Sequence, residues 1–374
     1  MNETKYSTLY KALKDDILSG KYASGEVLPS ENALTRRFKV CRSTVQQAFR
    51  ELEKVGLISR RRGRGTFVNG KMGSRKIGLL SFDTVRYEFA GMMVRTVSAL
   101  ARKNDYTLLF SDFSTEDIDS LQSEAEKFVQ KLVREGVSGV LYIPLGFCSR
   151  ASEINHCVLN LLRENRIPVV LSDFGVDGMM GEYDVVGINN FKAGERVVDY
   201  LLSIGARRID FWKQPHAALS HLERAKGARY AATIEHGRAS RFRIINAEPN
   251  SSSALNRCFR PNRPDAIICA NDNIAATLIK TLEKADVSVP DDVMIVAFDD
   301  IELARFLTPS LTTIHQPCEQ IAEVAFRRLI DRVNDHSLPI EEIFLSAPLI
   351  TRRSTRRSNQ ASKKRKGAHN EGKR

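Results

Sequence analysis

Short apolar runs alternate with amphipathic segments along most of this 374-residue chain, and this alternation limits the possible folds more than any other feature. The runs Ile77–Leu80, Val140–Ile143 and Pro168–Leu171 have the length and composition of buried strands, and segments of helical spacing lie between them. Strands that alternate with helices form parallel sheets covered by helices on both faces. The sequence therefore predicts an α/β fold with doubly wound parallel sheets.

The alternation starts a second time after Asp184–Gly187, with a helix at Ala193–Ser203 and a further series of strands. Two successive series predict two lobes with a cleft between them, within one domain at residues 76–351. Ligands of such folds bind beyond the carboxyl ends of the strands, and a two-lobed cleft can close by a hinge motion. We expect the chain to cross between the lobes near residues 187–190, 314–317 and 337–343.

Charge is distributed very unevenly along the chain. The formal net charge is +12, but residues 1–75 carry +9, residues 352–374 carry +9, and the middle carries −6. This distribution predicts a polyanionic partner for the ends and a different role for the middle. The last segment, 352–374, has no apolar residue beyond two alanines, so we expect a disordered basic tail that adds phosphate attraction or solubility.

Several classes of protein are disfavoured. No apolar run is long enough to span a membrane, and the first residues lack the apolar core of a signal peptide, so we expect a cytoplasmic protein with no membrane partner. The cysteines lie far apart without a CxxC pair, which indicates reduced thiols and no metal site. Neither a GxSxG elbow nor a P-loop is present, and we expect neither enzymatic activity nor a cofactor. The six cysteines are Cys41, Cys148, Cys157, Cys258, Cys269 and Cys318.

The first 70 residues predict three helices followed by a β-hairpin. Ser30 is a natural N-cap for the second helix, and the apolar stripe within Val45–Leu52 places a third helix from about Arg42. The hairpin tip, Arg60–Gly65, contains four arginines and two glycines. An ordinary helical bundle with a solvated basic face has the same helices, but the arginine-rich hairpin favours a winged helix-turn-helix. In that fold the third helix enters the major groove and the wing contacts the backbone or minor groove.

The motifs of this segment stand in a recognisable order over residues 5–69: Leu28-Pro29-Ser30-Glu31, Phe38-x-Val40-x-Arg42-x-Thr44-Val45, Leu52-x-x-x-Gly56-Leu57-Ile58 and Gly63-Arg64-Gly65-Thr66-Phe67-Val68. This set resembles the DNA-binding domain of the GntR family. The resemblance implies that duplex operator DNA is contacted by the start of the second helix, the third helix and the wing. The expected DNA-binding residues are Ser30, Glu31, Asn32, Arg42, Ser43, Thr44, Gln46, Arg62, Gly63, Arg64, Gly65 and Thr66.

A second set of motifs follows the short polar linker 71–75 and covers about residues 76–350. It comprises Ser220-x-x-x-Arg224-x-x-Gly227, Ala270-Asn271-Asp272-Asn273, Val289-Pro290-Asp291-Asp292-Val293, Phe298-Asp299-Asp300 and Pro309-x-Leu311-Thr312-Thr313-Ile314. This set resembles the LacI/GalR type of effector domain, which has the periplasmic-binding-protein fold. A GntR-type DNA-binding domain joined to such an effector domain resembles the arrangement of arabinose repressors.

The resemblance also implies a ligand site. Arg224 matches an arginine that contacts ligand oxygens, and Asp299 matches a carboxylate that accepts from ligand hydroxyls. Asn271 follows a strand whose end supplies ligand contacts in this fold. Asp173 and Gln316 also follow strands, and aromatic rings in loops of the first lobe can stack on a sugar face. These rings are Tyr87, Phe89 and Phe147.

The sequence is consistent with two functions. The first is a ligand-responsive transcriptional regulator, in the resembled families a homodimeric repressor that a small polyol or sugar effector releases from its operator. The second is a sugar-binding or sugar-processing protein with an auxiliary DNA-binding head. A nucleophile–base pair near Asn271 or Asp299 would favour the second, and no such pair is visible in the sequence.

Overall fold

The computed structural model describes residues 5–18, 21–22, 25–54, 56–61, 64–68, 75–82, 84, 88–113, 118–235, 241–260 and 263–357. The chain divides into two compact units near residue 76. Among the described residues, no helix combines the length and apolar character that crossing a membrane requires.

The N-terminal unit has three helices and an antiparallel hairpin, as predicted. Its elements are α1 (Lys5–Leu18), α2 (Glu31–Phe38), α3 (Arg42–Lys54), β1 (Ile58–Arg61) and β2 (Gly65–Val68). The helices bury one apolar cluster that includes Leu13, Leu34 and Phe49. Ser30 caps α2 as predicted, because its side chain accepts a hydrogen bond from the Ala33 backbone N–H.

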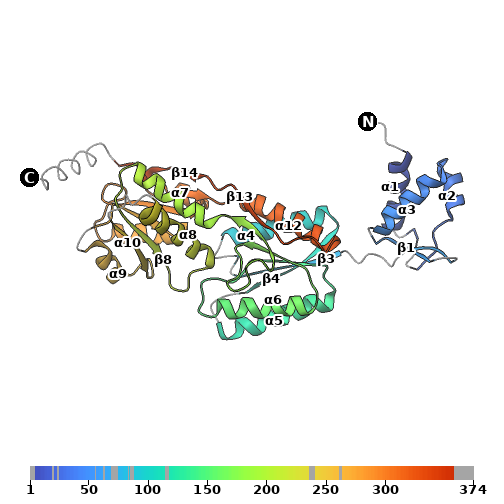
Figure 1. The fold of residues 1–374 in the computed structure, drawn as a ribbon, viewed down its shortest axis with the longest axis horizontal. Coiled ribbons are helices and arrows are strands. Elements are labelled where there is room, and N and C mark those ends of the chain that lie inside the picture. The colour runs from blue at the N-terminus through green and yellow to red at the C-terminus, as the bar shows by residue number, and fades with distance from the viewer. Residues whose placement is uncertain are drawn as a thin grey trace, which may run out of the picture. The chain divides into compact units, whose positions relative to one another are not determined.

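The second unit contains two six-stranded sheets, one in each lobe, which confirms the predicted fold (Figure 1). The first lobe has the strand order β13-β7-β6-β5-β3-β4. Its α5 and α6 pack together on one side of the sheet, and α4 packs with α12 on the other (Figure 1). The elements of this lobe are β3 (Arg75–Phe82), α4 (Glu88–Lys103), β4 (Tyr106–Phe113), α5 (Ile118–Glu135), β5 (Val140–Tyr142), α6 (Ala151–Glu164), β6 (Val169–Asp173), β7 (Asp184–Ile188), α12 (Cys318–Asn334) and β13 (Glu342–Leu345).

The second lobe has the strand order β14-β12-β11-β10-β8-β9, in which the pairs from β9 to β12 are parallel and β14 is antiparallel. Its central strands β10 and β11 are buried and apolar up to Asp299, the partly buried last residue of β11. The elements are α7 (Asn190–Ser203), β8 (Arg208–Lys213), α8 (Leu219–Tyr230), a π-helical turn (Ala231–Glu235), β9 (Arg241–Asn246), α9 (Ser252–Phe259), β10 (Ala266–Cys269), α10 (Asp272–Glu283), β11 (Met294–Asp299), α11 (Leu303–Phe306), β12 (Thr312–His315), β14 (Leu349–Ile350) and a 3₁₀ turn (Arg353–Thr355).

The chain passes between the lobes three times. The first two passages follow β7 and β12, at the predicted places near 187–190 and 314–317. The third lies at residues 346–348 rather than at 337–343, because β13 still pairs with β7 in the first lobe. Side chains of β13 alternate between exposed and half-buried, and this pattern of a partly solvated edge strand hid the element from the sequence analysis.

The prediction of a disordered tail from residue 352 is wrong for its first six residues. Residues 352–357 belong to the second lobe: Ser354 is fully buried and its Oγ donates to the Ile295 carbonyl at 2.6 Å. The Arg352 guanidinium pairs with Asp300 at 2.6 Å. Basic composition concealed this packing, since the arginines here have specific acceptors. Residues 358–374 lie outside the described residues.

Candidate functional site

A cavity lies between the two lobes at the carboxyl ends of their strands. It is lined by all the predicted ligand residues except Tyr87, which is not among the described residues. Its interior has a volume of about 80 Å³. The structure thus brings together side chains that are far apart in the sequence, and their role in binding stays a prediction. The predicted residues on its wall are Phe89, Phe147, Asp173, Arg224, Asn271, Asp299 and Gln316.

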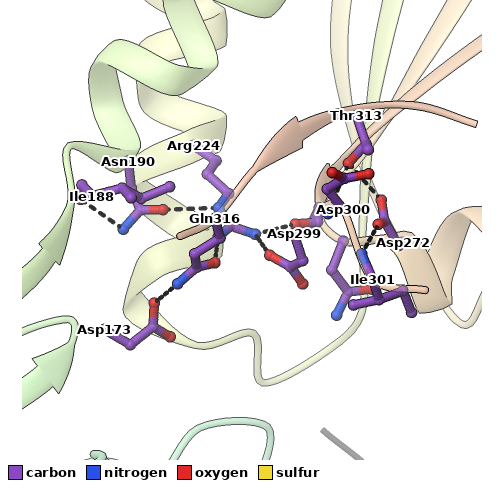
Figure 2. A network of polar contacts seen from close by, with 12 residues as sticks. Asp173, Ile188, Asn190, Arg224, Asp272, Asp299, Asp300, Ile301, Thr313 and Gln316 are labelled. Carbon is purple, nitrogen blue, oxygen red and sulfur yellow. Dashed lines mark hydrogen bonds and ion pairs between the residues drawn. The ribbon is translucent and has the colours of Figure 1, made fainter. Parts of the chain in front are cut away.

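Arg224 is the centre of a polar network at this cavity (Figure 2). The side chain is 2% exposed and lies on α8. Its Nε donates to Asn190 Oδ1 at 2.8 Å, and its Nη1 donates to the Ala270 carbonyl at 2.8 Å and to Asp299 Oδ1 at 3.0 Å. Its Nη2 donates to Gln316 Oε1 at 3.2 Å. The guanidinium also lies 4.7 Å from the centre of the Phe298 ring, so both its edge and its face are held.

Two glycines let α8 approach α7 closely enough for this network to form. A Cβ on Gly227 would lie 1.9 Å from the Phe191 carbonyl oxygen, and a Cβ on Gly194 would lie 2.1 Å from the Arg224 carbonyl oxygen. No other residue fits at such separations without moving the backbone. The spacing Arg224-x-x-Gly227 therefore has a physical reason, because the glycine places the arginine one turn away beside Asn190.

Polar contacts join the two lobes at the same place. Gln316, which follows β12 of the second lobe, donates through Nε2 to Asp173 Oδ1 at the end of β6 in the first lobe, at 2.6 Å (Figure 2). The Glu302 backbone N–H contacts Glu88 Oε1 at 3.4 Å. The Arg224 network is thus continuous from one lobe to the other.

The two carboxylates beside Arg224 have unusual environments. Burial raises the pKa of Asp173 to about 6, against the opposing effect of Arg224 and with a further increase from Asp299. Burial also raises the pKa of Asp299, and Arg224 opposes this increase. Both residues have positive φ angles, 78° and 111°, in a region that is strained for side chains of this kind. Such groups cluster at functional sites.

Asn271 has both of the roles that the sequence left open. Its Oδ1 caps α10 by accepting from the Ile274 backbone N–H at 2.9 Å, and the residue also lines the cavity. The cap occupies the carbonyl oxygen, so the side-chain NH₂ is the group left to face a ligand.

The aromatic residues are placed partly as expected. Phe147 lies in a loop with φ 63°, as predicted, whereas Phe89 lies in the first turn of α4 and not in a loop. The helix begins at Glu88, where an acidic residue is favourable at the positive end of the helix dipole. Phe82 and Phe174 also line the cavity, and the sequence analysis did not identify them.

His221 is the most notable residue that sequence reasoning missed. It is 3% exposed, lines the cavity, and makes an edge contact with the Phe147 ring at 5.0 Å between centroids. It precedes Arg224 by three positions on α8, so the two share one helix face, and this spacing was the available signal.

The expected DNA-reading surface is built around Glu31 at the start of α2. Its carboxylate accepts from Arg42 Nε at 2.8 Å, from Gln46 Nε2 at 3.1 Å and from Arg60 Nη2 at 2.5 Å. The Arg42 side chain is 70% exposed although it is paired. Glu31 thereby orients the start of α3 and the base of the wing.

The other expected DNA-binding residues are distributed as follows. Ser30, Asn32, Ser43, Arg64 and Gly65 are exposed, and Thr44 is half-buried. Thr66 is only 9% exposed, because alternate residues of β2 face the core, and its role in DNA binding stays a prediction. Arg62 and Gly63 lie outside the described residues.

Comparisons with known proteins identify both units. Residues 5–68 match the model of the bacterial regulatory proteins of the gntR family, and residues 198–355 match that of the periplasmic binding protein-like domain. The chain is 28% identical over 367 residues to an arabinose metabolism transcriptional repressor of Geobacillus stearothermophilus, covering 94% of this chain and 98% of that protein. The chain therefore joins a DNA-binding domain of the gntR family to a periplasmic binding protein-like domain, and it is similar along its whole length to a transcriptional repressor.

A second repressor and a solved structure are also similar to this chain. The HTH-type transcriptional repressor PurR of Photobacterium profundum is 28% identical over 237 residues, which cover 62% of this chain and 68% of PurR. The fold resembles that of a periplasmic binding protein/LacI transcriptional regulator from Alkaliphilus metalliredigens, solved in complex with D-xylulofuranose. The TM-score is 0.62 at 24% identity, with 76% of this chain and 100% of that chain covered. The curated relatives are transcriptional regulators and not enzymes.

In the part of the chain that the structure describes, no group of three or more His, Cys, Asp or Glu side chains is arranged to hold a metal ion.

Proposed function

We propose that this repressor binds its operator as a homodimer and is released when a small sugar or related polyol occupies the cleft between the lobes. The observation that carries the proposal is the Arg224 network, which combines donors and acceptors from both lobes at one cavity. A polyol needs such a mixture, because each hydroxyl both donates and accepts, and a buried hydroxyl without partners costs about 1–3 kcal/mol.

Two similar proteins support a sugar as the effector. One relative is named as a repressor of arabinose metabolism, and one structural neighbour was solved with D-xylulofuranose.

We propose a dimer because one DNA-binding domain contacts only a short DNA sequence. A single recognition helix contacts only a few base pairs, which are too few to select one site in a genome, and a twofold dimer doubles the site. We therefore propose a near-palindromic operator. Analytical ultracentrifugation that finds only monomer at micromolar concentration, with and without operator DNA, contradicts this part of the proposal.

Release from the operator requires that the ligand favours one arrangement of the lobes. A ligand shifts such an equilibrium only by its difference in affinity for the two states. Contacts to both lobes, through Arg224 on one side and Asp173 on the other, supply that difference in the closed state. A change in lobe angle then reaches the DNA-binding domains through the linkers at residues 71–75.

The test measures operator affinity and ligand binding in one preparation of the full chain. Fluorescence anisotropy with labelled operator is expected to show a fall in affinity on addition of the effector sugar. The same sugar at 100 times its Kd raises the free energy of unfolding by about 2.7 kcal/mol. Binding without any change in operator affinity contradicts effector release. Chemical conversion of the sugar during the experiment would instead favour the sugar-processing function.

A further inference from the structure

Carboxylates outnumber cationic groups on the cavity wall. Glu88, Asp173 and Asp299 line it, and Arg224 is the one Arg or Lys side chain among its described lining residues. Three helices begin at the cavity, and two of them have an acidic residue in the first turn, Glu88 in α4 and Asp272 in α10, whereas α8 has none. The acidic residues oppose the partial positive charge at the starts of α4 and α10.

The single arginine has little capacity left for an anion. A guanidinium has five N–H donors, and Arg224 directs four hydrogen bonds to Asn190, Ala270, Asp299 and Gln316. The bidentate fork that binds phosphate or carboxylate in other sites is thus occupied by protein acceptors. An anionic ligand at this wall would face Asp173 and Asp299 without a free counter-charge.

His221 does not supply that counter-charge. Burial, together with the positive charges of Arg224 and Lys213, lowers the pKa of His221 well below its usual value, so the imidazole is neutral at pH 7. Its Nδ1 is buried without a hydrogen-bond partner among the described residues. The Phe147 edge contact holds the ring in place against the cavity. A buried polar atom in this situation fits a ligand hydroxyl, which can either donate to it or accept from it.

We propose that the effector is an uncharged polyol, without phosphate or carboxylate groups, and that His221 forms a direct hydrogen bond to one of its hydroxyls. This inference rests on the proposed function and narrows the class of sugar that the same site accepts. Carboxylate oxygens of Asp173 and Asp299 accept from hydroxyls of the ligand, and the apolar wall of Phe82, Phe89 and Phe147 contacts its C–H face. The site therefore selects by charge as well as by shape.

The first experiment is isothermal titration calorimetry of the full chain against matched ligands. The probes are L-arabinose, D-ribose and D-xylulose, each beside its 5-phosphate, with D-glucuronate as a carboxylated sugar. We expect at least one neutral sugar to bind, and its phosphate to bind at least 100-fold more weakly. A phosphate that binds as tightly as its parent sugar, or more tightly, overturns the inference while leaving sugar sensing intact. If no probe of either kind binds, the proposed sugar function fails as well.

The second experiment tests the residues. Glu88→Gln and Asp173→Asn are expected to reduce the discrimination against the phosphate at least threefold each. Asp177→Asn is the matched control, since Asp177 is exposed in the same lobe and does not line this cavity. Discrimination that is unchanged in both test variants, or reduced equally in the control, contradicts selection by these carboxylates.

His221→Phe keeps a ring but removes the hydrogen-bonding nitrogens, and we expect it to weaken neutral-sugar binding at least tenfold. His221→Gln retains a donor and an acceptor and is expected to lose less. His156→Phe on α6 is the control, because His156 is only half-buried and does not line the cavity. Circular dichroism melting checks that each variant is folded. If folded His221→Gln and His221→Phe both bind the sugar like the wild type, the direct contact is wrong.

Discussion

Gly146 of the first lobe lies directly against Ala218 of the second lobe. A Cβ placed on Gly146 would lie 2.6 Å from the Ala218 Cβ and 3.2 Å from its Cα. Both residues border loops at the cavity, and Gly146 also forms part of its wall. This separation is possible only for a glycine, so the approach of the two lobes depends on the missing side chain at this position.

A side chain at Gly146 should prevent the two lobes from closing fully. We expect Gly146→Val to weaken effector binding at least tenfold, because the clash opposes closure without removing any polar contact to the ligand. Small-angle scattering should show a larger radius of gyration in the presence of the effector than for the wild type. Gly146→Ala combined with Ala218→Gly should recover part of the affinity lost in Gly146→Ala alone. Equal affinity of Gly146→Val and the wild type would contradict the lobe contact.

A second prediction concerns the packing of α7 against α8. We expect Gly227→Ala to lower the free energy of unfolding by about 1–3 kcal/mol, because the new methyl group overlaps the Phe191 carbonyl oxygen. It should also displace Arg224 and weaken effector binding. Chemical denaturation and calorimetry measure the two effects. Lys226→Ala, an exposed change on the same helix, is the control and should alter neither quantity substantially.

The residues around the cavity show which parts of the site could be predicted from the sequence and which could not. The family resemblance carried by Ser220-x-x-x-Arg224-x-x-Gly227 predicted Arg224 as a ligand residue, and the structure places it on the cavity wall. The Gln316–Asp173 hydrogen bond joins residues 143 positions apart, and no local pattern reports such a contact. Sequence therefore predicted which strand ends carry ligand-type residues, and the tertiary fold decided which of them meet.

Two elements near the C-terminus were not predicted correctly from the sequence. Residues 352–357 have the charge of a tail, but Ser354 and Arg352 bond to groups of the second lobe that precede them by more than 40 positions. Similarly, β13 is only four residues long, and its pairing with β7, far earlier in the chain, was not visible in the sequence. In both cases long-range pairing overrode local propensity.

The environment of Asp173 predicts a pH effect on stability. Its folded-state pKa of about 6 lies above the unfolded value near 3.8, so the folded state binds the proton more tightly. Stability from this group is therefore fully present below about pH 4 and is lost as the pH rises to about 6. Asp173→Asn can still accept from Gln316 and carries no charge. We expect it to be more stable than the wild type at pH 7.5, by on the order of 1–3 kcal/mol, and similar at pH 4.

Thermal denaturation at a series of pH values measures this difference. The gap between Asp173→Asn and the wild type should open between pH 4 and 6 and then stay constant. Asp177→Asn provides the matched control and should follow the wild-type curve. A gap of the same size at pH 4 and pH 7.5 would mean that the effect of the substitution is not electrostatic.

The DNA-binding domain gives a prediction that separates specific from general contacts. Arg42→Ala removes an exposed guanidinium at the start of α3 and should weaken operator binding by about 1–3 kcal/mol if the group contacts a guanine. Arg64→Ala in the wing should lower the affinity for all duplexes. It should also reduce the slope of the logarithm of the binding constant against the logarithm of salt concentration by about 1. Anisotropy titrations at several salt concentrations, with operator and scrambled DNA, distinguish the two. Unchanged operator affinity in both variants contradicts the proposed reading surface.

The two parts of the C-terminal segment should behave differently when they are removed. A chain ending at Arg357 loses six basic side chains and one acidic side chain, and we expect its melting temperature to stay within about 2 °C of the wild type while its affinity for scrambled DNA falls. A chain ending at Thr351 also loses Ser354, to which the Thr312 backbone N–H donates at 2.8 Å, and the Arg352–Asp300 ion pair. The hydrogen bond is buried and the ion pair is half-buried, so we expect this truncation to lower the free energy of unfolding by about 2–5 kcal/mol. Equal melting temperatures for the two truncations would show that residues 352–357 contribute nothing to the second lobe. Unchanged affinity for scrambled DNA in the chain ending at Arg357 would remove the basic segment from the DNA-binding apparatus and leave the N-terminal domain as its sole contributor.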